Sequence, residues 1–219
     1  EYNYISSPIT SASVEGALVS SYVVRYNPST AVTLNDGWEF ITSGQMELGR
    51  GYAVSGKTNS NSSDRRYFDG VPNNGNINIV IDGATYGGEG DQWNMVGNPY
   101  PSSIDMQRFL SGNSGIGAIY VYNQANNSYN TYNILSAPGG VTIASGQAFF
   151  IHASQVSQTI SFTNAMRVRE NANIVRDASV DGTILHLYKD DEEQFSTRIA
   201  FHADATDAYD IKFDAPLLP

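Results

Sequence analysis

Short runs rich in Val, Ile, Tyr and Phe alternate along the chain with clusters of Gly, Asn, Pro and Ser. Almost no stretch has the 3.6-residue periodicity of a helix, so the pattern predicts strands. The clearest run is Tyr67–Ile81, in which Asn74-Gly75 favours a tight hairpin turn and Ile77, Ile79 and Ile81 occupy every second position. We expect an all-β fold with a hairpin at this place.

A second hairpin is expected at Ala118–Ile134, with Gln124–Asn127 as its loop. This register places Tyr122 opposite Tyr129 as a cross-strand aromatic pair. Another strand is expected at Tyr2–Ile5.

One short segment has a helical pattern. It runs from about Ser103 to Leu110, with Ser102 or Ser103 as the N-cap, and it ends at Gly112.

The chain also resembles itself at a spacing of roughly 91–97 residues. The matching segments are Tyr4–Ile9 with Asn94–Tyr100, Arg25–Asn27 with Val121–Asn123, and Leu48–Val54 with Ile143–Phe150. We therefore predict two tandem sandwich-like repeats, residues 1–88 and 91–170, that pack on each other about a pseudo-twofold axis. A glycine-rich linker, Gly83–Gly90, joins them.

This repeat makes a specific structural prediction. Superposition of the two copies places Pro8 on Pro99, and Gly51–Val54 on Gly146–Phe149.

Residues 171–219 form a third unit that carries six of the ten net negative charges. Strands are expected at Thr183–Tyr188 and Thr197–His202, too few for an independently stable sandwich. This acidic unit is therefore predicted to be truncated, or completed by packing on the 91–170 repeat or by a strand from a neighbouring copy.

The strings Trp93–Asp105, Tyr120–Asn123, Ile143–Phe150 and Ile160–Arg167 together resemble a β-rich module of large secreted Bacteroidota proteins. Leu185–Asp214 is similar to the strand-rich segment that commonly follows this module. The resemblance implies cargo of the type IX secretion system, often surface or adhesin-like proteins. It implies no agreed biochemical activity.

Composition narrows the classes of partner. A net charge of −10 and an estimated pI near 4.5 disfavour binding to nucleic acid. The chain has no cysteine, which excludes disulfides and thiolate sites, and no apolar run approaches the roughly 20 residues of a membrane helix. The composition is rich in polar, uncharged residues, and the sequence begins within a predicted strand. Both features predict an extracellular segment of a larger protein.

Catalytic signals are weak. The three histidines, His152, His186 and His202, lie in strand-like runs, and no Gly-x-Ser-x-Gly elbow accompanies them. The acidic run Asp190–Glu193 is typical of a solvated turn rather than of paired catalytic carboxylates.

Two acidic groups could hold Ca²⁺, which prefers oxygen ligands. The first group is Asp204, Asp207, Asp210 and Asp214. The second flanks the linker and comprises Asp82, Glu89 and Asp91. Neither has the EF-hand spacing, and solvated acidic turns are the alternative interpretation.

Aromatic and amide residues suggest a carbohydrate site, because sugar CH groups pack on ring faces while amides bind hydroxyls. The candidate residues are Tyr122, Tyr129, Tyr132, Asn123, Asn126 and Asn130. The tyrosines are expected to be exposed, whereas Trp38, Trp93, Phe149 and Phe150 are expected in the core.

These observations predict a non-enzymatic extracellular module with a structural or adhesive role, for example as a subunit of a fibre or assembly. The alternative is a carbohydrate-binding module attached to a secreted polysaccharide-active enzyme. Expected partners are other segments of the same large protein, neighbouring copies or a polysaccharide, with no nucleic acid and no membrane span. No cofactor is expected apart from the Ca²⁺ considered above.

Overall fold

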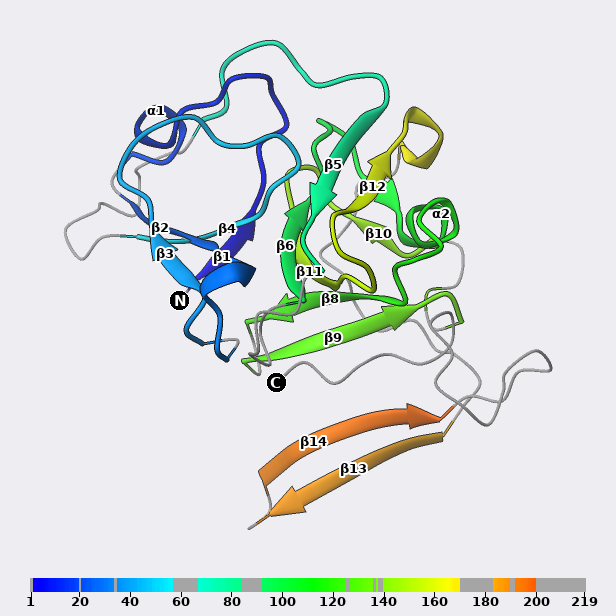
Figure 1. The fold of residues 1–219 in the computed structure, drawn as a ribbon. Coiled ribbons are helices and arrows are strands. Elements are labelled where there is room, and N and C mark those ends of the chain that lie inside the picture. Colours follow the sequence, from blue (N-terminus) through cyan, green and yellow to red (C-terminus); the bar gives the residue numbers. More distant parts are fainter. Residues whose placement is uncertain are drawn as a thin grey trace.

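The fold was analysed in a computed structural model. It describes residues 2–19, 21–33, 35–56, 67–83, 92–124, 127–135, 137 and 140–169, together with the backbone of two strands, 183–189 and 192–199. Strands in antiparallel sheets dominate and the helices are short, so the predicted all-β class is confirmed (Figure 1).

The first sheet contains four strands from the N-terminal part of the chain. They are β1 (Asn3–Ile5), β2 (Ser21–Tyr26), β3 (Trp38–Phe40) and β4 (Tyr52–Gly56). Their spatial order is β1-β4-β2-β3. The strand expected at Tyr2–Ile5 is thus present as β1.

The second sheet repeats this order. Its strands are β6 (Trp93–Gly97), β8 (Ala118–Asn123), β9 (Ser128–Asn133) and β11 (Ala148–His152), arranged as β6-β11-β8-β9. The β8–β9 hairpin pairs Tyr122 with Tyr129, as the sequence predicts.

The two sheets share one apolar cluster, which we call the inter-sheet core. It is built from alternate residues of both sheets and from Ala31 in the loop after β2. The sheet residues are Val24, Tyr26, Ala53, Trp93, Met95, Ala118, Tyr120, Ala148 and Phe150, with Tyr4, Trp38 and Tyr129 packed at the margin. Phe150 points into this cluster and its neighbour Phe149 points to the opposite side of the sheet. Among the described residues, the inter-sheet core therefore lies between one sheet from each predicted repeat.

Reciprocal backbone contacts join the two sheets. The Ser6 amide donates to the Gly146 carbonyl at 2.7 Å, and the Gly97 amide donates to the Gly49 carbonyl at 3.0 Å. Isolated bridges repeat the pattern, Ile5 with Gln147 and Arg50 with Val96. The two sheets thus contact each other through matching positions, and the predicted duplication about a pseudo-twofold axis stays a prediction.

The strand register corrects how the two copies align. Ile5 lies opposite Tyr52 and Val96 lies opposite Phe149, so Tyr52 corresponds to Phe149. Gly51 then corresponds to Ala148 rather than to Gly146, and the expected superposition is wrong by two residues. Gly49 is the true counterpart of Gly146, since both have positive φ angles, 72° and 65°.

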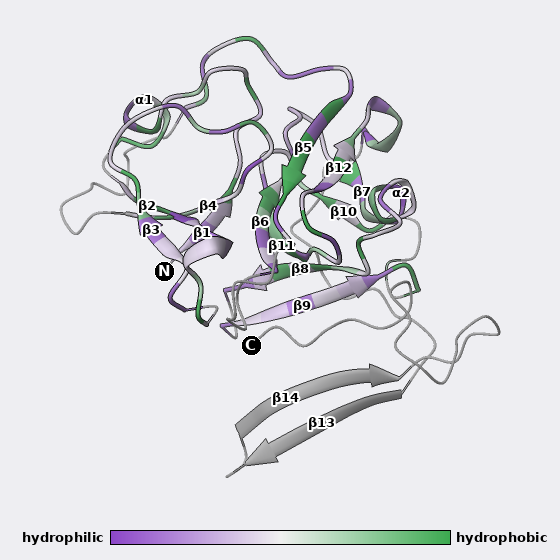
Figure 2. Ribbon diagram, viewed as in Figure 1, coloured by the Kyte–Doolittle hydropathy of each residue, from purple (hydrophilic) through white to green (hydrophobic). Residues whose placement is uncertain are grey.

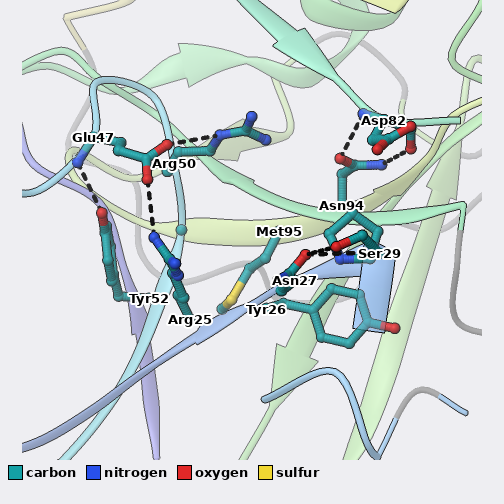
Figure 3. A pocket seen from close by; sticks show the side chains of 12 residues that line it. Arg25, Tyr26, Asn27, Ser29, Glu47, Arg50, Tyr52, Asp82, Asn94 and Met95 are labelled. Carbon is teal, nitrogen blue, oxygen red and sulfur yellow. Dashed lines mark hydrogen bonds and ion pairs between the residues drawn. The ribbon is translucent and has the colours of Figure 1, made fainter. Parts of the chain in front are cut away.

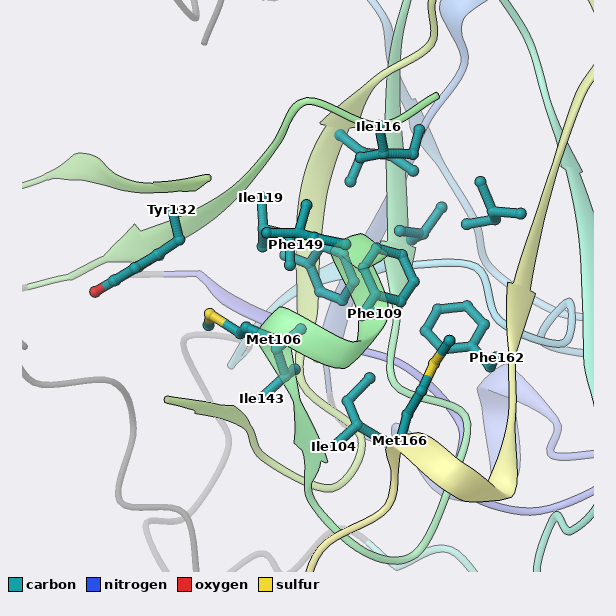
Figure 4. Close-up of a cluster of buried hydrophobic side chains, with 14 of the residues drawn as sticks. Ile104, Met106, Phe109, Ile116, Ile119, Tyr132, Ile143, Phe149, Phe162 and Met166 are labelled. Atoms are coloured by element: carbon teal, nitrogen blue, oxygen red, sulfur yellow. The ribbon is translucent and has the colours of Figure 1, made fainter. Parts of the chain in front are cut away.

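The outer face of each sheet has its own apolar cluster. Behind the first sheet, the first outer core contains Ile9, Ala12, Val14, Ala17, Leu18, Val23, Met46, Tyr52 and Val54. Behind the second sheet, the larger second outer core includes Phe109, Phe149 and Phe162 (Figure 4).

Two pairs of strands cover the second outer core. They are β5 (Ile77–Ile81) with β12 (Gln158–Phe162), and β7 (Ile104–Asp105) with β10 (Thr142–Ile143). The three isoleucines of β5 point inward and Figure 2 shows this strand as largely hydrophobic. The hairpin expected at Tyr67–Ile81 is wrong, because β5 pairs with β12 and not with the residues before it. β5 thus joins the core of the second predicted repeat.

Within the described ranges there are also four short helical segments. They are α1 (Val14–Ala17), η1 (Pro28–Thr30), α2 (Met106–Gly112) and η2 (Asn164–Met166). The predicted helix exists as α2 but begins later than expected. Its N-cap is Asp105, whose carboxylate accepts from the Arg108 amide at 2.8 Å, and not Ser102 or Ser103. The sequence analysis did not predict α1.

The C-terminal region contains a two-stranded antiparallel sheet of β13 (Thr183–Lys189) and β14 (Glu192–Ile199). The first strand agrees with prediction. The second begins at Glu192, so Glu192 and Glu193 belong to a strand and not to the predicted acidic turn. Completion of this unit by the rest of the chain or by a neighbouring copy stays a prediction.

Candidate functional site

The residues predicted to bind sugar lie on the β8–β9 hairpin, and the structure brings only some of them together. Tyr122 and Tyr129 are paired neighbours and both are half-buried. Tyr132 is 5% exposed and packs in the second outer core, because it pairs with Ile119 and shares its face. Its expected exposure is wrong.

The predicted amide ligands have mixed positions. Asn123 and Asn130 are half-buried on β8 and β9, and Asn126 lies outside the described residues. Asn130 lies opposite Val121, one position along the strand from the tyrosine pair. Asn130 and Tyr129 therefore point to opposite faces of the sheet and cannot contact one sugar from the same side.

The tyrosine pair is held by internal contacts. Tyr4 stacks on Tyr122 at a centroid distance of 4.9 Å, and the Tyr4 and Tyr129 hydroxyls are 2.7 Å apart. Burial raises the pKa of Tyr4 to about 12 and also raises that of Tyr129. These rings stabilise the margin of the inter-sheet core rather than forming an open platform.

Of the residues predicted to bind calcium, the structure describes Asp82 alone. Asp204, Asp207, Asp210 and Asp214 all lie outside the described residues, as do Glu89 and Asp91. In the described part of the chain no three His, Asp or Glu side chains gather as a metal site requires. His152 packs edge-on against Trp93 at 5.0 Å, an ordinary packing position.

A pocket opens where the first sheet meets β6, at a place that the sequence analysis did not single out (Figure 3). Its volume is ≈ 260 Å³, slightly below the roughly 300 Å³ at which drug-sized sites begin. It is lined by Arg25, Tyr26, Asn27, Pro28, Ser29, Glu47, Arg50, Gly51, Tyr52, Asp82, Asn94 and Met95. Such a volume suits a ligand of one small ring.

Two arginines and two glutamates form a connected network at the pocket. Arg25 bonds Glu39 through Nε at 3.0 Å and Glu47 through Nη1 at 3.2 Å. Arg50 reaches the second carboxylate oxygen of Glu47 at 3.5 Å and donates to the Val80 carbonyl at 2.8 Å. Each charge faces an opposite charge, and the side chains are held in place by more than one contact.

Local backbone structure positions these groups. Arg25 on β2 lies directly opposite Glu39 on β3, so the sheet register creates the first ion pair. Asn27 caps η1 by accepting from the Ser29 amide, and its amide nitrogen donates to Glu39 at 2.6 Å. The Glu47 amide donates to the Tyr52 hydroxyl at 2.8 Å, which fixes the loop before β4.

The hydrogen bond from Asn27, with a smaller contribution from Arg25, lowers the pKa of Glu39. Glu39 is therefore an anion throughout the neutral range. A general acid needs the opposite shift, so this carboxylate is suited to holding Arg25 and not to donating a proton.

The opposite wall of the pocket comes from the end of β5 and from β6. The Asn94 side chain accepts from the Asp82 amide at 3.0 Å and donates to the Asp82 carbonyl at 2.7 Å. This closed pair of hydrogen bonds holds the end of β5 against β6. Met95, next to it, supplies an apolar surface.

The sequence matches a described family, the domain of unknown function DUF8693, over residues 1–218. The chain belongs to this family. No curated protein and no solved structure matches it. Because the DUF8693 match includes residues 171–218, the family unit contains the β13–β14 strands as well as the two sheets. Within the described part of this DUF8693 chain, no helix combines the length and apolarity needed to cross a membrane.

One sequence signal could have located the pocket of this DUF8693 chain. Arg25 and Arg50 are the two basic residues of residues 1–56, and both line it. Their separation along the chain hides the relation, since only the pairing of β2, β3 and β4 brings them together.

Proposed function

We propose that this chain is a non-catalytic module of a secreted or cell-surface protein, with a structural or adhesive role. The observation that carries the proposal is the charge network of the pocket. Arg25, Arg50, Glu39 and Glu47 neutralise one another and are each held in place, so they are arranged to orient a ligand rather than to transfer protons.

The packing and hydrogen bonding between the two sheets support the structural role. One apolar cluster runs between them, and reciprocal backbone bonds join Ser6 to Gly146 and Gly97 to Gly49. Such a double attachment makes a stiff unit that is suited to repetition within a large extracellular protein. The acidic composition and the resemblance to secreted Bacteroidota surface proteins support the location, and other segments or copies of such proteins are the proposed partners.

A depletion assay tests this function. The 219-residue chain is mixed with insoluble polysaccharides and with surface proteins, and we measure both its loss from solution and the release of reducing ends or peptides. The expected result is retention by at least one polymer with no release of product. Product release that disappears when Glu47 is replaced by Gln would contradict the proposal.

The carbohydrate-binding alternative also has an observation in its favour. The pocket combines planar polar groups with the ring of Tyr26 and the apolar atoms of Met95, the mixture that sugar sites use. On this alternative the site lies at the pocket, and Tyr122→Ala with Tyr129→Ala weakens binding only if the tyrosine pair is the true platform. The depletion assay with that double variant separates the two locations.

A further inference from the structure

The pocket has a counterpart in the other half of the molecule. Tyr26 pairs with Trp38 as Tyr122 pairs with Tyr129, and two residues earlier Val24 and Tyr120 lie opposite Ala53 and Phe150. The register therefore equates Arg25-Tyr26-Asn27-Pro28 with Val121-Tyr122-Asn123-Gln124. The same register equates Asn94 and Met95 with Asn3 and Tyr4.

In the second half the counterpart position is filled. The Tyr4 ring stacks on Tyr122, and its hydroxyl bonds Tyr129. Gln124 then closes the edge, donating through Nε2 to the Tyr2 carbonyl at 2.7 Å and to Oδ1 of Asn3 at 2.9 Å. The sugar platform expected from the sequence is thus the closed member of the pair.

At the pocket, two residues differ from their counterparts at the closed position and leave the space open. Met95 stands where Tyr4 stands and brings no ring against Tyr26. Pro28 stands where Gln124 stands and has no side-chain donor to bridge to β6. The result is the ≈ 260 Å³ pocket.

The pocket also has charged lining residues that its closed counterpart lacks. Arg25 replaces Val121, and the lining contains two arginines, Arg25 and Arg50, and two carboxylates, Asp82 and Glu47. Their formal charges cancel, so neither an anion nor a cation gains much from entering. Within the described residues, Arg25 donates to glutamates from Nε and Nη1, which are two of the five N–H bonds of a guanidinium. Donors and acceptors are thus both presented to a ligand.

We propose that this pocket binds one neutral sugar residue. Its hydroxyls bond the Arg25 and Arg50 guanidinium groups and the Glu47 carboxylate. Its apolar face packs on Pro28 and on the small parts of Tyr26 and Met95 that reach the pocket, since these two side chains are 8% and 3% exposed. The proposal rests on the non-catalytic function above and names the ligand of that site. The same chemistry is offered by a free monosaccharide and by the terminal residue of a glycan chain.

Titration of the full chain with methyl glycosides of glucose, galactose, mannose and N-acetylglucosamine tests the proposal, with binding followed by calorimetry or NMR. We expect saturable binding of at least one, with a Kd on the order of 1 mM for so small a ligand. A second arm uses an array of glycans that end in the same residues. Tighter binding there identifies a chain end as the ligand, and equal affinity identifies the free sugar.

Two variants locate the site. Met95→Tyr supplies the residue found at the closed counterpart and should abolish binding. Arg50→Gln, at a side chain that is one-third exposed, should weaken binding at least tenfold without disturbing the core if Met95→Tyr does not fold. Gln124→Ala at the closed counterpart is the matched control and should leave the affinity unchanged.

The outcomes separate the two proposals. No saturable binding to any sugar, with no turnover either, overturns the sugar site and leaves the non-catalytic function standing. Binding that survives in both Met95→Tyr and Arg50→Gln places the ligand elsewhere and also overturns it. Release of hydrolysed product overturns the non-catalytic function itself.

Discussion

The two four-stranded sheets have the same strand order but very different surroundings. Counting only the residues that the structure describes, the first outer core has nine buried residues and is covered by α1 and loops, whereas the second has twenty-one and is covered by α2 and two extra strand pairs. The outermost strand pairs, β2–β3 and β8–β9, differ in charge. The first sheet has Arg25 and Glu39 where the second sheet has Val121 and Asn130. The first sheet thus has the smaller outer core and a charged edge, and the second sheet has the larger outer core and an uncharged edge.

Comparison of the two sheets shows which positions are restricted to small residues and which positions vary in size and charge. The positions that meet in the middle stay small, because Ser6 lies against Gly97 and Gly51 against Ala148. Positions at the ends of β2 and β8 differ in size and charge without changing the register.

The largest expected effect tests the difference between the two outer cores. Phe149→Ala should lower the free energy of unfolding by ~3–5 kcal/mol, because Phe149 is fully buried and packs edge-on against Phe109 at 5.5 Å. Its counterpart variant, Tyr52→Ala, should lose less, since the Tyr52 ring packs in the smaller cluster. Urea unfolding of both variants gives the comparison, and equal or reversed losses would refute it.

A smaller effect is expected where the halves touch. A Cβ on Gly97 would lie 2.4 Å from the Cβ of Ser6, so Gly97→Ala should cost ~1–3 kcal/mol through overpacking. Removing the opposing atom in Ser6→Gly with Gly97→Ala should recover most of that loss. The double-mutant cycle, measured by thermal or urea unfolding, yields a large favourable coupling energy if these residues face each other. A coupling near zero would break the correspondence between the halves.

The smallest effect concerns the charged edge of the first sheet and its dependence on pH. The pKa of Glu39 is lowered from the usual 4.5 in the folded protein, so its contribution to stability is present above that value and is lost as the pH falls through the folded pKa. Glu39→Gln should therefore be less stable than the parent by under about 1 kcal/mol at neutral pH, with the gap closing in acid.

Thermal unfolding from pH 7 to pH 3 measures this gap. The matched control is Asn130→Asp, which places a carboxylate at the counterpart position opposite Val121, where no arginine faces it. That variant should show no gain at neutral pH. A similar pH dependence in both variants would show that Arg25 and Asn27 do not set the behaviour of Glu39.

The sequence predicts local features well and distant ones poorly. Alternation correctly indicates that Ile77, Ile79 and Ile81 face a core, because inward and outward positions of a strand follow a period of two. The nearby Asn74-Gly75 suggested a local partner, whereas the actual partner is β12. A turn is predicted from neighbouring residues alone. A strand pairing at long range depends instead on which apolar faces must be covered in the folded protein.

The candidate site shows the same limit. Tyr122 and Tyr129 were correctly paired, but their exposure depended on Tyr4, which lies more than 100 residues earlier in the chain. The pocket was missed because Arg25, Glu39, Glu47 and Arg50 come from different strands and loops. Asp105 takes the place of the expected serine cap because Ile104 and Asp105 pair with β10 as a strand, a tertiary contact that helix propensity does not contain.

The pairing of β5 with β12 has a consequence for how the molecule is made. Ile79 and Ile160, which lie opposite each other, are 81 residues apart in the chain. At roughly 5–20 residues per second, a growing chain needs roughly 4–16 s between the synthesis of one and of the other. Until then β5 has an apolar face and no partner strand, so the second outer core closes only after Phe162 has been made. Such high contact order makes folding slow, and a fragment that stops before Gln158 should expose this face to aggregation.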